Sequence, residues 1–283
     1  MNFPINFTKM SGTGNDFIVI DHRRPLLDKT EFSSFARSVC RRKFSVGADG
    51  LILLEDSDKA DFCWQFYNAD GSEAEMCGNG ARCAARFAWK NKIAPAKMRF
   101  LTLAGEIQAE VKDDLVKLAM TRPTAVSMAR HIELGNESKD IYSINTGVPH
   151  AVCFVTDNKQ TPVKEWGEIV RFHNLFQPAG TNANFVQITG LAELYVRTYE
   201  RGVEDETMAC GTGAVAAAVM AGLLGRVTSP TKVMTSGGEF LTIYFTIKNQ
   251  EPAELTEIYL EGPAHFIYEG RLNKEAINNL HIR

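Results

Sequence analysis

The sequence Cys77-Gly78-Asn79-Gly80-Ala81-Arg82 returns downstream, with its cysteine and glycines in place, as Cys210-Gly211-Thr212-Gly213-Ala214-Val215. In each copy the glycines lead into a run rich in alanine and other apolar residues, which predicts a buried helix. Each cysteine therefore lies where a helix begins. Two such helix starts in one chain set the expectations for both fold and chemistry.

A cysteine at a helix start has a distinct chemical setting. The first turn of a helix carries N–H groups without intrahelical acceptors and the positive end of the helix dipole, so it favours a thiolate and attracts anions. A thiol pKa of about 8.5 can fall to roughly 3.5–7.5 in such places. Neighbouring glycines allow a carboxylate to approach the backbone. The motif indicates proton transfer beside a bound carboxylate.

The surrounding sequence repeats in the same register. A spacing of 133 residues separates Cys77 from Cys210, and the same spacing separates Thr13-Gly14 from Thr146-Gly147. It also relates Thr102, Gly105 and Glu106 to their later counterparts Thr235, Gly238 and Glu239. Three anchors at one spacing indicate a duplicated domain rather than unrelated glycine turns.

The repeat predicts an α+β protein of two homologous domains related by pseudo-symmetry. We expect residues 1–130 to carry Cys77 and residues 131–283 to carry Cys210, with the final residues able to pack back on the first domain. The polar stretch 131–140 is expected to separate the halves. Short strand patterns around each helix favour mainly antiparallel sheets. Two related helix starts can face each other across a cleft between domains, where ligands often bind.

The composition of the chain limits the kinds of binding partner to expect. The 283 residues include 31 basic and 34 acidic side chains, a net charge of −3, without a dense basic run. Nucleic acid and membrane surfaces are therefore disfavoured, and a small-molecule partner is favoured. No apolar run approaches the roughly 20 residues needed to span a bilayer.

The cysteines indicate the compartment. The six cysteines include no CxxC pair and no Cys/His spacing typical of zinc, and the N-terminus lacks a signal pattern. We expect a reduced, cytoplasmic protein without a bound metal. Cys40, Cys83 and Cys153 fall within apolar patterns and are expected to be ordinary buried thiols.

Each of several polar residues beside these motifs has two possible roles. Asn15 and Asn68 lie in glycine-containing loops, where each can stabilise a turn or donate to a ligand. His150 can be a hydrogen-bonded structural histidine, or it can orient a ligand and bias a thiol. Glu200-Arg201 lies at a strand end before Cys210 and can hold an ammonium and a carboxylate. The alternative is a weak surface pair.

Taken together, these motifs resemble those of the diaminopimelate epimerase family, in order and over essentially the whole chain. The shared stretches are Gly12-Thr-Gly-Asn15-Asp16-Phe17, Phe66-Tyr-Asn68-Ala-Asp-Gly-Ser-Glu, Cys77-Gly-Asn-Gly-Ala-Arg-Cys83, Thr181-Asn182-Ala-Asn-Phe185, Tyr199-Glu-Arg-Gly202, Ala209-Cys-Gly-Thr-Gly-Ala214 and Gly262-Pro-Ala264. The resemblance implies two similar domains, each with strands wrapped around a central helix, and a homodimer. It implies cofactor-independent interconversion of LL- and meso-2,6-diaminopimelate, in lysine and peptidoglycan precursor biosynthesis.

The resemblance also implies residue roles. Cys77 and Cys210 match the two acid/base cysteines, and His150 and Glu200 match residues thought to tune those thiols. The backbone donors to the reacting carboxylate match Gly78, Asn79, Gly211 and Thr212, and the other substrate contacts match Asn15, Asn68, Asn182, Glu200 and Arg201.

The chain departs from the family pattern at two positions. Some members carry glutamine where this chain has Gly50, and many carry Gly-Asn-Pro-His where it has Gly147-Val148-Pro149-His150. An amide at position 148 is therefore absent. Asn145 or a water molecule is expected to supply that contact to the distal end of the substrate.

Three other functions are weighed against this one. A proline racemase-type enzyme would also use paired cysteines, but the set Asn15, Asn68, Asn182 and Arg201 indicates a second amino-acid end that proline lacks. A thiol redox protein would need cysteines able to pair, and the chain has no CxxC. A non-catalytic binding protein would have no reason to keep both thiols.

Overall fold

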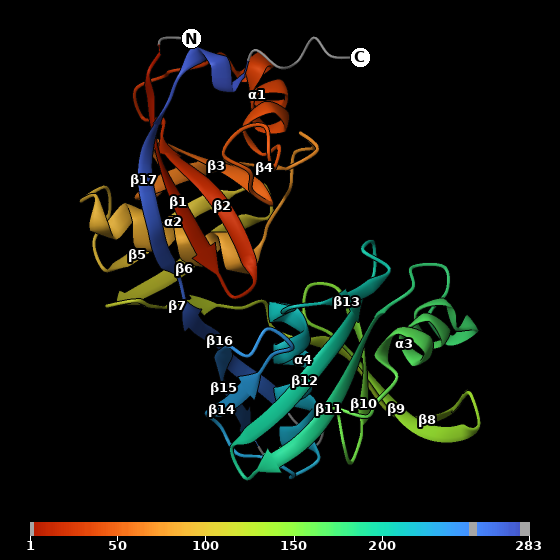
Figure 1. The fold of residues 1–283 in the computed structure, drawn as a ribbon. Helices are drawn as coiled ribbons and strands as arrows, with labels where there is room; N and C mark the ends of the chain where they lie inside the picture. The colour runs from red at the N-terminus through yellow and green to blue at the C-terminus, as the bar shows by residue number, and fades with distance from the viewer. Residues whose placement is uncertain (1–2, 249–253, 278–283) are drawn as a thin grey trace. The chain divides into compact units, whose positions relative to one another are not determined.

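The computed structural model describes residues 3–248 and 254–277, and within it the chain forms two compact units (Figure 1). The first unit contains Met1–Leu118 together with Gly262–Arg283, and the second contains Ala119–Glu261. The boundary expected after residue 130 falls inside strand β8 (Thr124–Leu134). The stretch 131–140, expected to separate the halves, forms instead the tip of the β8–β9 hairpin, because Leu134 pairs with Glu137 across a tight turn.

The strands of the first unit follow one another across a curved sheet. They are β1 (Ile5–Gly12), β2 (Asn15–Asp21), β3 (Gly50–Glu55), β4 (Phe62–Asn68), β5 (Lys97–Thr102), β6 (Gly105–Lys112), β7 (Leu115–Ala119) and, from the C-terminal segment, β17 (His265–Leu272). The pairs β2–β3 and β4–β5 are parallel. The pairs β1–β2, β3–β4, β5–β6, β6–β7 and β1–β17 are antiparallel.

The second unit repeats this order of pairing. Its strands are β8, β9 (Glu137–Asn145), β10 (Pro149–Phe154), β11 (Asn182–Gly190), β12 (Glu193–Glu200), β14 (Thr231–Met234), β15 (Phe240–Lys248) and β16 (Glu254–Pro263), with the short β13 (Asp205–Thr207) beside β12. The pairs β10–β11 and β12–β14 are parallel. Strands β9–β10, β11–β12, β14–β15 and β15–β16 are antiparallel, and β8 pairs with β9 as β17 pairs with β1.

The helices show the same duplication. A peripheral helix follows β2 in the first unit and β10 in the second, α1 (Phe32–Val39) and α3 (Val163–Phe172). A central helix of 13 residues follows β4 in the first unit and the β12–β13 pair in the second, α2 (Gly78–Lys90) and α4 (Gly211–Leu223). Single 3-10 turns lie at Lys29–Glu31, Asn174–Phe176 and Lys274–Ala276.

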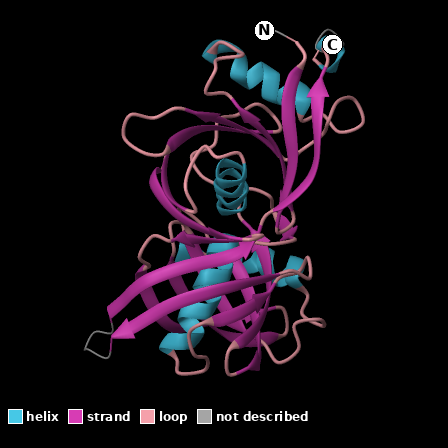
Figure 2. Ribbon diagram, turned by 90° about the vertical axis from the view of Figure 1, so that its left-hand side faces the viewer, coloured by secondary structure: helices cyan, strands magenta, loops and turns pink. Residues whose placement is uncertain are grey.

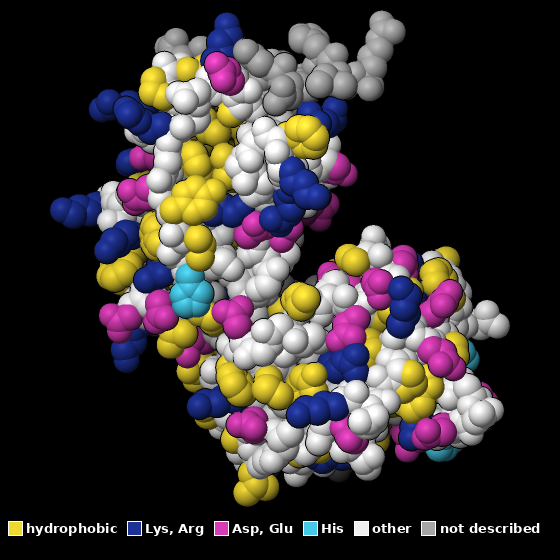
Figure 3. All heavy atoms as spheres, in the orientation of Figure 1, with side chains coloured by type: hydrophobic (Ala, Val, Ile, Leu, Met, Phe, Trp, Pro, Cys, Tyr) yellow, Lys and Arg dark blue, Asp and Glu magenta, His cyan; other side chains and the backbone are white. Residues whose placement is uncertain are grey.

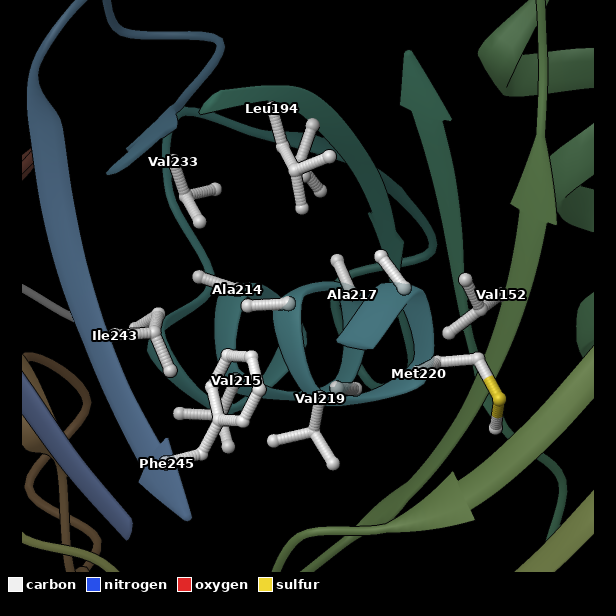
Figure 4. Packing of buried hydrophobic residues seen from close by; sticks show 14 of the residues in the cluster. Val152, Leu194, Ala214, Val215, Ala217, Val219, Met220, Val233, Ile243 and Phe245 are labelled. Carbon is white, nitrogen blue, oxygen red and sulfur yellow. The ribbon is translucent and has the colours of Figure 1, made fainter. Parts of the chain in front are cut away.

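Each central helix is enclosed by its own sheet. Figure 2 shows strands of the first unit curving around a central helix, which is α2. In the second unit the α4 residues from Gly213 to Ala221 are all buried, and side chains such as Leu194, Val233 and Ile243 pack around them (Figure 4). Alanine suits this position because it has the highest helix propensity and lets the strands approach closely.

The predicted fold class is confirmed. Each unit is a mainly antiparallel barrel-like sheet around a central helix, and the shared pairing order is the structural counterpart of the spacing of 133 residues in the sequence.

Candidate active site

Both cysteines occupy the N-cap of a central helix. Cys77 has an extended backbone with φ −142° and ψ 120°, and Cys210 has φ −122° and ψ 108°. The carbonyl of each accepts the first helical hydrogen bond, from Ala81 at 2.8 Å and from Ala214 at 2.9 Å. The N–H groups of the next three residues therefore have no acceptor inside the helix. The predicted helix starts are confirmed at Gly78 and Gly211.

The cysteines fall into two groups by environment. Cys63, Cys77 and Cys210 are partly exposed, and of these Cys63 lies on strand β4, away from both helix starts. Cys40, Cys83 and Cys153 are buried, as the apolar patterns predicted. Burial raises the pKa of each of these three buried thiols to about 12, so they stay protonated at neutral pH. Helix-start placement and partial exposure are the features that reactive cysteines need.

A chain of side-chain amides lies beside the Cys77 helix start. Nδ2 of Asn79 donates to Oδ1 of Asn15 at 2.8 Å and to the Thr13 carbonyl at 3.3 Å. Nδ2 of Asn15 in turn donates to the Asp49 carboxylate at 3.0 Å. The predicted residues Asn15, Gly78 and Asn79 are thus brought together in the first unit. The side chain of Asn15 is held by hydrogen bonds with Asn79 and Asp49. A residue that only stabilised a turn would not need these contacts.

A cluster of charged residues braces this loop from behind. Asp16 pairs with Lys9 at 2.8 Å and with Arg42 at 2.5 Å, and Arg42 also reaches Asp49 at 2.9 Å. Burial opposes ionisation of Asp16, but hydrogen bonds from Arg42 and Lys9 outweigh it and hold its pKa below the ordinary value. Arg42 therefore holds the Asp49 carboxylate that anchors Asn15, while Lys9 and Arg42 together hold the neighbouring Asp16.

Asn68 lies at the exposed end of β4. Its Nδ2 donates to Oγ of Ser72 at 3.0 Å, and its backbone N–H donates to the Ser72 carbonyl at 2.8 Å. Asn68 pairs directly with Gly50, the residue after Asp49. It therefore forms a turn and also lies on the strand next to the loop that anchors Asn15.

Thr212 and Thr146 surround the Cys210 helix start. Sγ of Cys210 lies 3.5 Å from Oγ1 of Thr212, and Oγ1 of Thr146 donates to the Thr212 carbonyl at 3.0 Å. Thr146 belongs to the loop that corresponds to Thr13 in the first unit. The glycine loop and the helix start are thus tied together in each half, by different side chains.

A buried polar triad lies beneath the first turn of α4. Nδ2 of Asn184 contacts Nδ1 of His150 at 3.1 Å, and Oγ1 of Thr198 donates to Oδ1 of Asn184 at 2.9 Å. Burial, together with the charge of Arg201, lowers the pKa of His150 to about 3, so the ring is neutral. Since an amide N–H must donate to Nδ1, the ring proton lies on Nε2. Within the described residues, this buried Nε2 has no hydrogen-bond partner.

The remaining predicted residues lie on strands β11 and β12. Asn182 is buried and pairs in register with His150 on β10. Its Oδ1 accepts from the Arg201 backbone N–H at 2.8 Å, and Nη1 of Arg201 donates to the Ala179 carbonyl at 2.8 Å. Burial raises the pKa of the Glu200 carboxyl. Glu200 and Arg201 are therefore more than an exposed surface pair.

Sequence reasoning did not find Asp49, Arg82, Asn184 or Thr198. The signal available for Arg82 was a charged residue one turn into a helix rich in small and apolar residues, because a charged residue buried there needs acceptors. Asn184 and Thr198 gave no comparable signal, since they become neighbours only through the β11–β12 pairing.

Two hollows within single units differ in how they relate to the site residues. A cavity of about 10 Å³ behind Cys210, lined in part by Thr198, Thr207 and Thr235, has room for about one water molecule. A hollow of about 1020 Å³ in the first unit lies at the other end of α2, beside Phe87 and Asn91.

The described residues include no cluster of three or more His, Cys, Asp or Glu side chains that could hold a metal ion. None of the helices described is long and apolar enough to cross a membrane. Figure 3 shows basic and acidic side chains interspersed over the visible face of the molecule.

Solved structures with similar folds include the phenazine biosynthesis protein of the PhzF family from Bacillus anthracis. It aligns with a TM-score of 0.72 over 96% of this chain and 100% of that one, at 15% identity. A probable proline racemase from Agrobacterium radiobacter K84 aligns with a TM-score of 0.68 over 97% of this chain and 94% of its own, at 13% identity. At 15% and 13% identity, these two similarities show a shared fold and nothing further.

Curated relatives are much more similar in sequence. The diaminopimelate epimerase of Aquifex aeolicus is 45% identical, covering 96% of this chain and 99% of the relative. That of Hydrogenobaculum sp. is 44% identical, covering 95% and 98%. The sequence model of diaminopimelate epimerase matches residues 7–126 and 142–267, one range in each half of the repeat. With two cysteine helix starts on a duplicated barrel and these relatives at near-full coverage, the chain belongs to the diaminopimelate epimerase family.

Proposed function

We propose that this chain interconverts LL- and meso-2,6-diaminopimelate, with Cys77 and Cys210 as the two acid/base groups. The observation that carries the proposal is the placement of two partly exposed thiols, Cys77 and Cys210, at the N-caps of equivalent 13-residue helices. An α-proton of an amino acid is very weakly acidic, and inversion removes it from one face and returns a proton to the other. Two bases on opposite faces suffice for this, without a cofactor.

In the proposed reaction one cysteine starts as thiolate and the other as thiol, and their roles exchange with direction. As the α-proton leaves, negative charge moves onto the substrate carboxylate. The N–H groups of Gly78, Asn79, Gly211 and Thr212 are the proposed donors to that charge. In comparable oxyanion sites each well-placed donor contributes about 2.7–4 kcal/mol.

The distal end of the substrate is assigned to Asn15, Asn68, Asn182, Glu200 and Arg201. Arg201 supplies a fork of donors that matches a carboxylate, and Glu200 supplies a charge that matches an ammonium. His150 and Glu200 are proposed to tune the thiols. Because the His150 ring is neutral, it would act on Cys210 through its dipole and its packing rather than through a positive charge.

We also propose a cytoplasmic homodimer that serves lysine and peptidoglycan precursor biosynthesis. Strand β17 supports the dimer, because Ile267 and Tyr268 on it remain 55% and 47% exposed although β17 is paired to β1. Exposed apolar residues on adjacent strand positions favour association. The molar mass in solution, measured by light scattering, tests this; a monomer at micromolar concentration would contradict it.

The function is tested by incubating the purified protein with LL-diaminopimelate in deuterated water. Each inversion should place one solvent deuterium at the α-carbon and yield the meso isomer, as followed by mass spectrometry and chiral chromatography. L-Proline serves as the control substrate and should remain unlabelled. Absence of both label and meso product from LL-diaminopimelate would refute the proposal.

A further inference from the structure

Arg82 is a fully buried arginine one turn inside α2, with 0% of its side chain exposed. A guanidinium stays charged in proteins, and burying a charge is costly unless its donors are satisfied. The residue at the same place in α4, 133 positions later, is the apolar Val215. The shared fold therefore does not require an arginine there, and its presence concerns the first half alone.

The partners of Arg82 converge on the Cys77 helix start. Nη2 donates to Oγ1 of Thr13 at 2.8 Å and to Oδ1 of Asn79 at 2.8 Å. Nη1 approaches the Gly78 carbonyl at 3.4 Å, and Nε donates to the Pro263 carbonyl at 3.3 Å. One planar group thus joins the glycine loop, the first helical turn and the C-terminal segment of the first unit.

These contacts fix the direction of the neighbouring amides. Because Oδ1 of Asn79 accepts from Arg82, Nδ2 of Asn79 must point toward Asn15 and the Thr13 carbonyl. Oδ1 of Asn15 accepts from Asn79, so its Nδ2 points to Asp49. A single guanidinium therefore sets the orientation of Asn79 directly and of Asn15 through it, two of the residues proposed to meet the substrate in this half.

In the second half, different side chains support the helix start at Cys210. The role of Arg82 is therefore confined to the first half. Near Cys210, Thr146 donates directly to the Thr212 carbonyl, and Asn184 and Thr198 pair across β11 and β12 beneath the helix start. The corresponding strand pair in the first half is Ile52 and Phe66. Ile52 and Phe17 lie beside Gly80, as Asn184 lies beside Gly213. Below α2 the strand side chains are apolar, and Arg82 supplies the polar support from the helix itself.

We propose that Arg82 is a positioning residue of the Cys77 half-site. Its guanidinium holds Thr13, Gly78 and Asn79 so that the first-turn N–H groups meet the carboxylate as charge develops on it. It also places a fixed positive charge beneath that point. The inference rests on the proposed epimerase function and extends it to a residue that does not touch the substrate.

The test compares Arg82→Met and Arg82→Lys with Arg86→Met. Arg86 is the matched control because it lies one turn further along α2 and donates to the carbonyls of Asp113 and Ala264, without contacting the helix start. All variants and the wild type are assayed for epimerisation of LL-diaminopimelate, and their folding is compared by circular dichroism and thermal melting.

We expect Arg82→Met to lower kcat by about 10- to 100-fold with KM changed less than about threefold, because misplaced donors weaken transition-state binding. Arg82→Lys keeps the charge and should fall between Arg82→Met and the wild type, while Arg86→Met should keep the wild-type kcat. A folded Arg82→Met variant with wild-type kcat would overturn the inference. So would an equal loss of kcat in Arg86→Met.

If Arg82→Met does not fold, Arg82→Lys and Thr13→Val decide the question, since each removes part of the same contacts and keeps the positive charge. Both should lower kcat, and wild-type kcat in both would overturn the inference. An inactive wild type would overturn the proposed function and this inference together, whereas an active wild type with unaltered Arg82 variants would overturn this inference alone.

Discussion

The Arg201 backbone N–H donates to Oδ1 of Asn182 over 2.8 Å, which ties the end of β12 to the start of β11. We expect Arg201→Lys to raise KM by about 10-fold or more, because a lysine lacks the fork that binds a carboxylate and a charged hydrogen bond contributes about 1.5–3 kcal/mol. Steady-state kinetics measure this. Arg226→Lys, at a site stacked over Phe154, is the control and should leave KM unchanged.

Replacement of either helix-start cysteine should abolish epimerisation. Cys77→Ala and Cys210→Ala each remove one of the two acid/base groups, and we expect losses of at least about 10³-fold in kcat. Cys63→Ser removes a thiol on β4 that belongs to neither helix start and should remain active. Substantial activity in either alanine variant would contradict the two-base scheme.

Two helix-start glycines should respond differently to alanine. A Cβ on Gly213 would lie 2.3 Å from Oδ1 of Asn184, so Gly213→Ala should destabilise the protein by about 1–3 kcal/mol. A Cβ on Gly78 meets no atom of the described residues within 4 Å, so Gly78→Ala should keep the wild-type stability. Its loss should appear in KM and kcat, since the methyl group would project toward the approaching carboxylate. Urea unfolding and kinetics separate the two effects, and equal stabilities for both variants would contradict this account.

His150 should make stability depend on pH in the acid range. Its folded pKa of about 3 lies below the unfolded value of about 6.5, so the unfolded chain binds the extra proton between these two pH values. Stability is therefore fully present above pH 6.5 and falls as the pH drops, by up to about 1.4 kcal/mol per pH unit from this residue. Urea unfolding from pH 7.5 to 4.5 should show a shallower slope for His150→Gln. Identical slopes would exclude His150 as the cause.

Val148→Asn tests the missing amide. Oδ1 of Asn145 already accepts from the Gly147 N–H at 2.9 Å and so helps to form the loop, which restricts how the side chain can turn toward a ligand. We expect Val148→Asn to lower KM by about 2- to 10-fold, as one added hydrogen bond contributes about 0.5–1.5 kcal/mol. Kinetics with both isomers measure this, and Val148→Leu is the control. A higher KM in Val148→Asn would show that the loop rejects the amide.

Local sequence patterns predicted those helices and strands that a few neighbouring residues are enough to identify. The glycines after Cys77 and Cys210 predicted the start of both central helices. A weak alternation over residues 63–67 predicted β4, and short apolar patterns over residues 106–111 and 151–155 predicted β6 and β10. Apolar residues at helical spacing over residues 28–42 predict one helix; the helix found is shorter, because a 3-10 turn capped by Asp28 precedes α1 and the helix ends at Val39. The pattern from Leu272 to Leu280 predicts a short closing helix; Lys274–Ala276 form a 3-10 turn, and residues 278–280 lie outside the described part of the chain.

The sequence did not predict which distant strands and helices pack against one another. Helix α3 and the β8–β9 hairpin were not expected, because Trp166 and Ile132 become buried only when distant strands meet them. In the sequence, Arg82 is only one residue of the Cys77 motif. Its contacts with Thr13 and Pro263 depend on the fold, so no local pattern predicts them.

Copying a gene segment produces a direct repeat, in which two sulfur atoms begin with identical surroundings. The two helix starts of this chain now differ in what supports them: a buried arginine bound to Thr13 and Asn79 in one half, and a neutral histidine with an amide and a hydroxyl in the other. The proposed two-base scheme needs one sulfur to be charged while the other is not. In that scheme, divergence of the copies would give each sulfur a distinguishable starting condition, which two identical halves would lack.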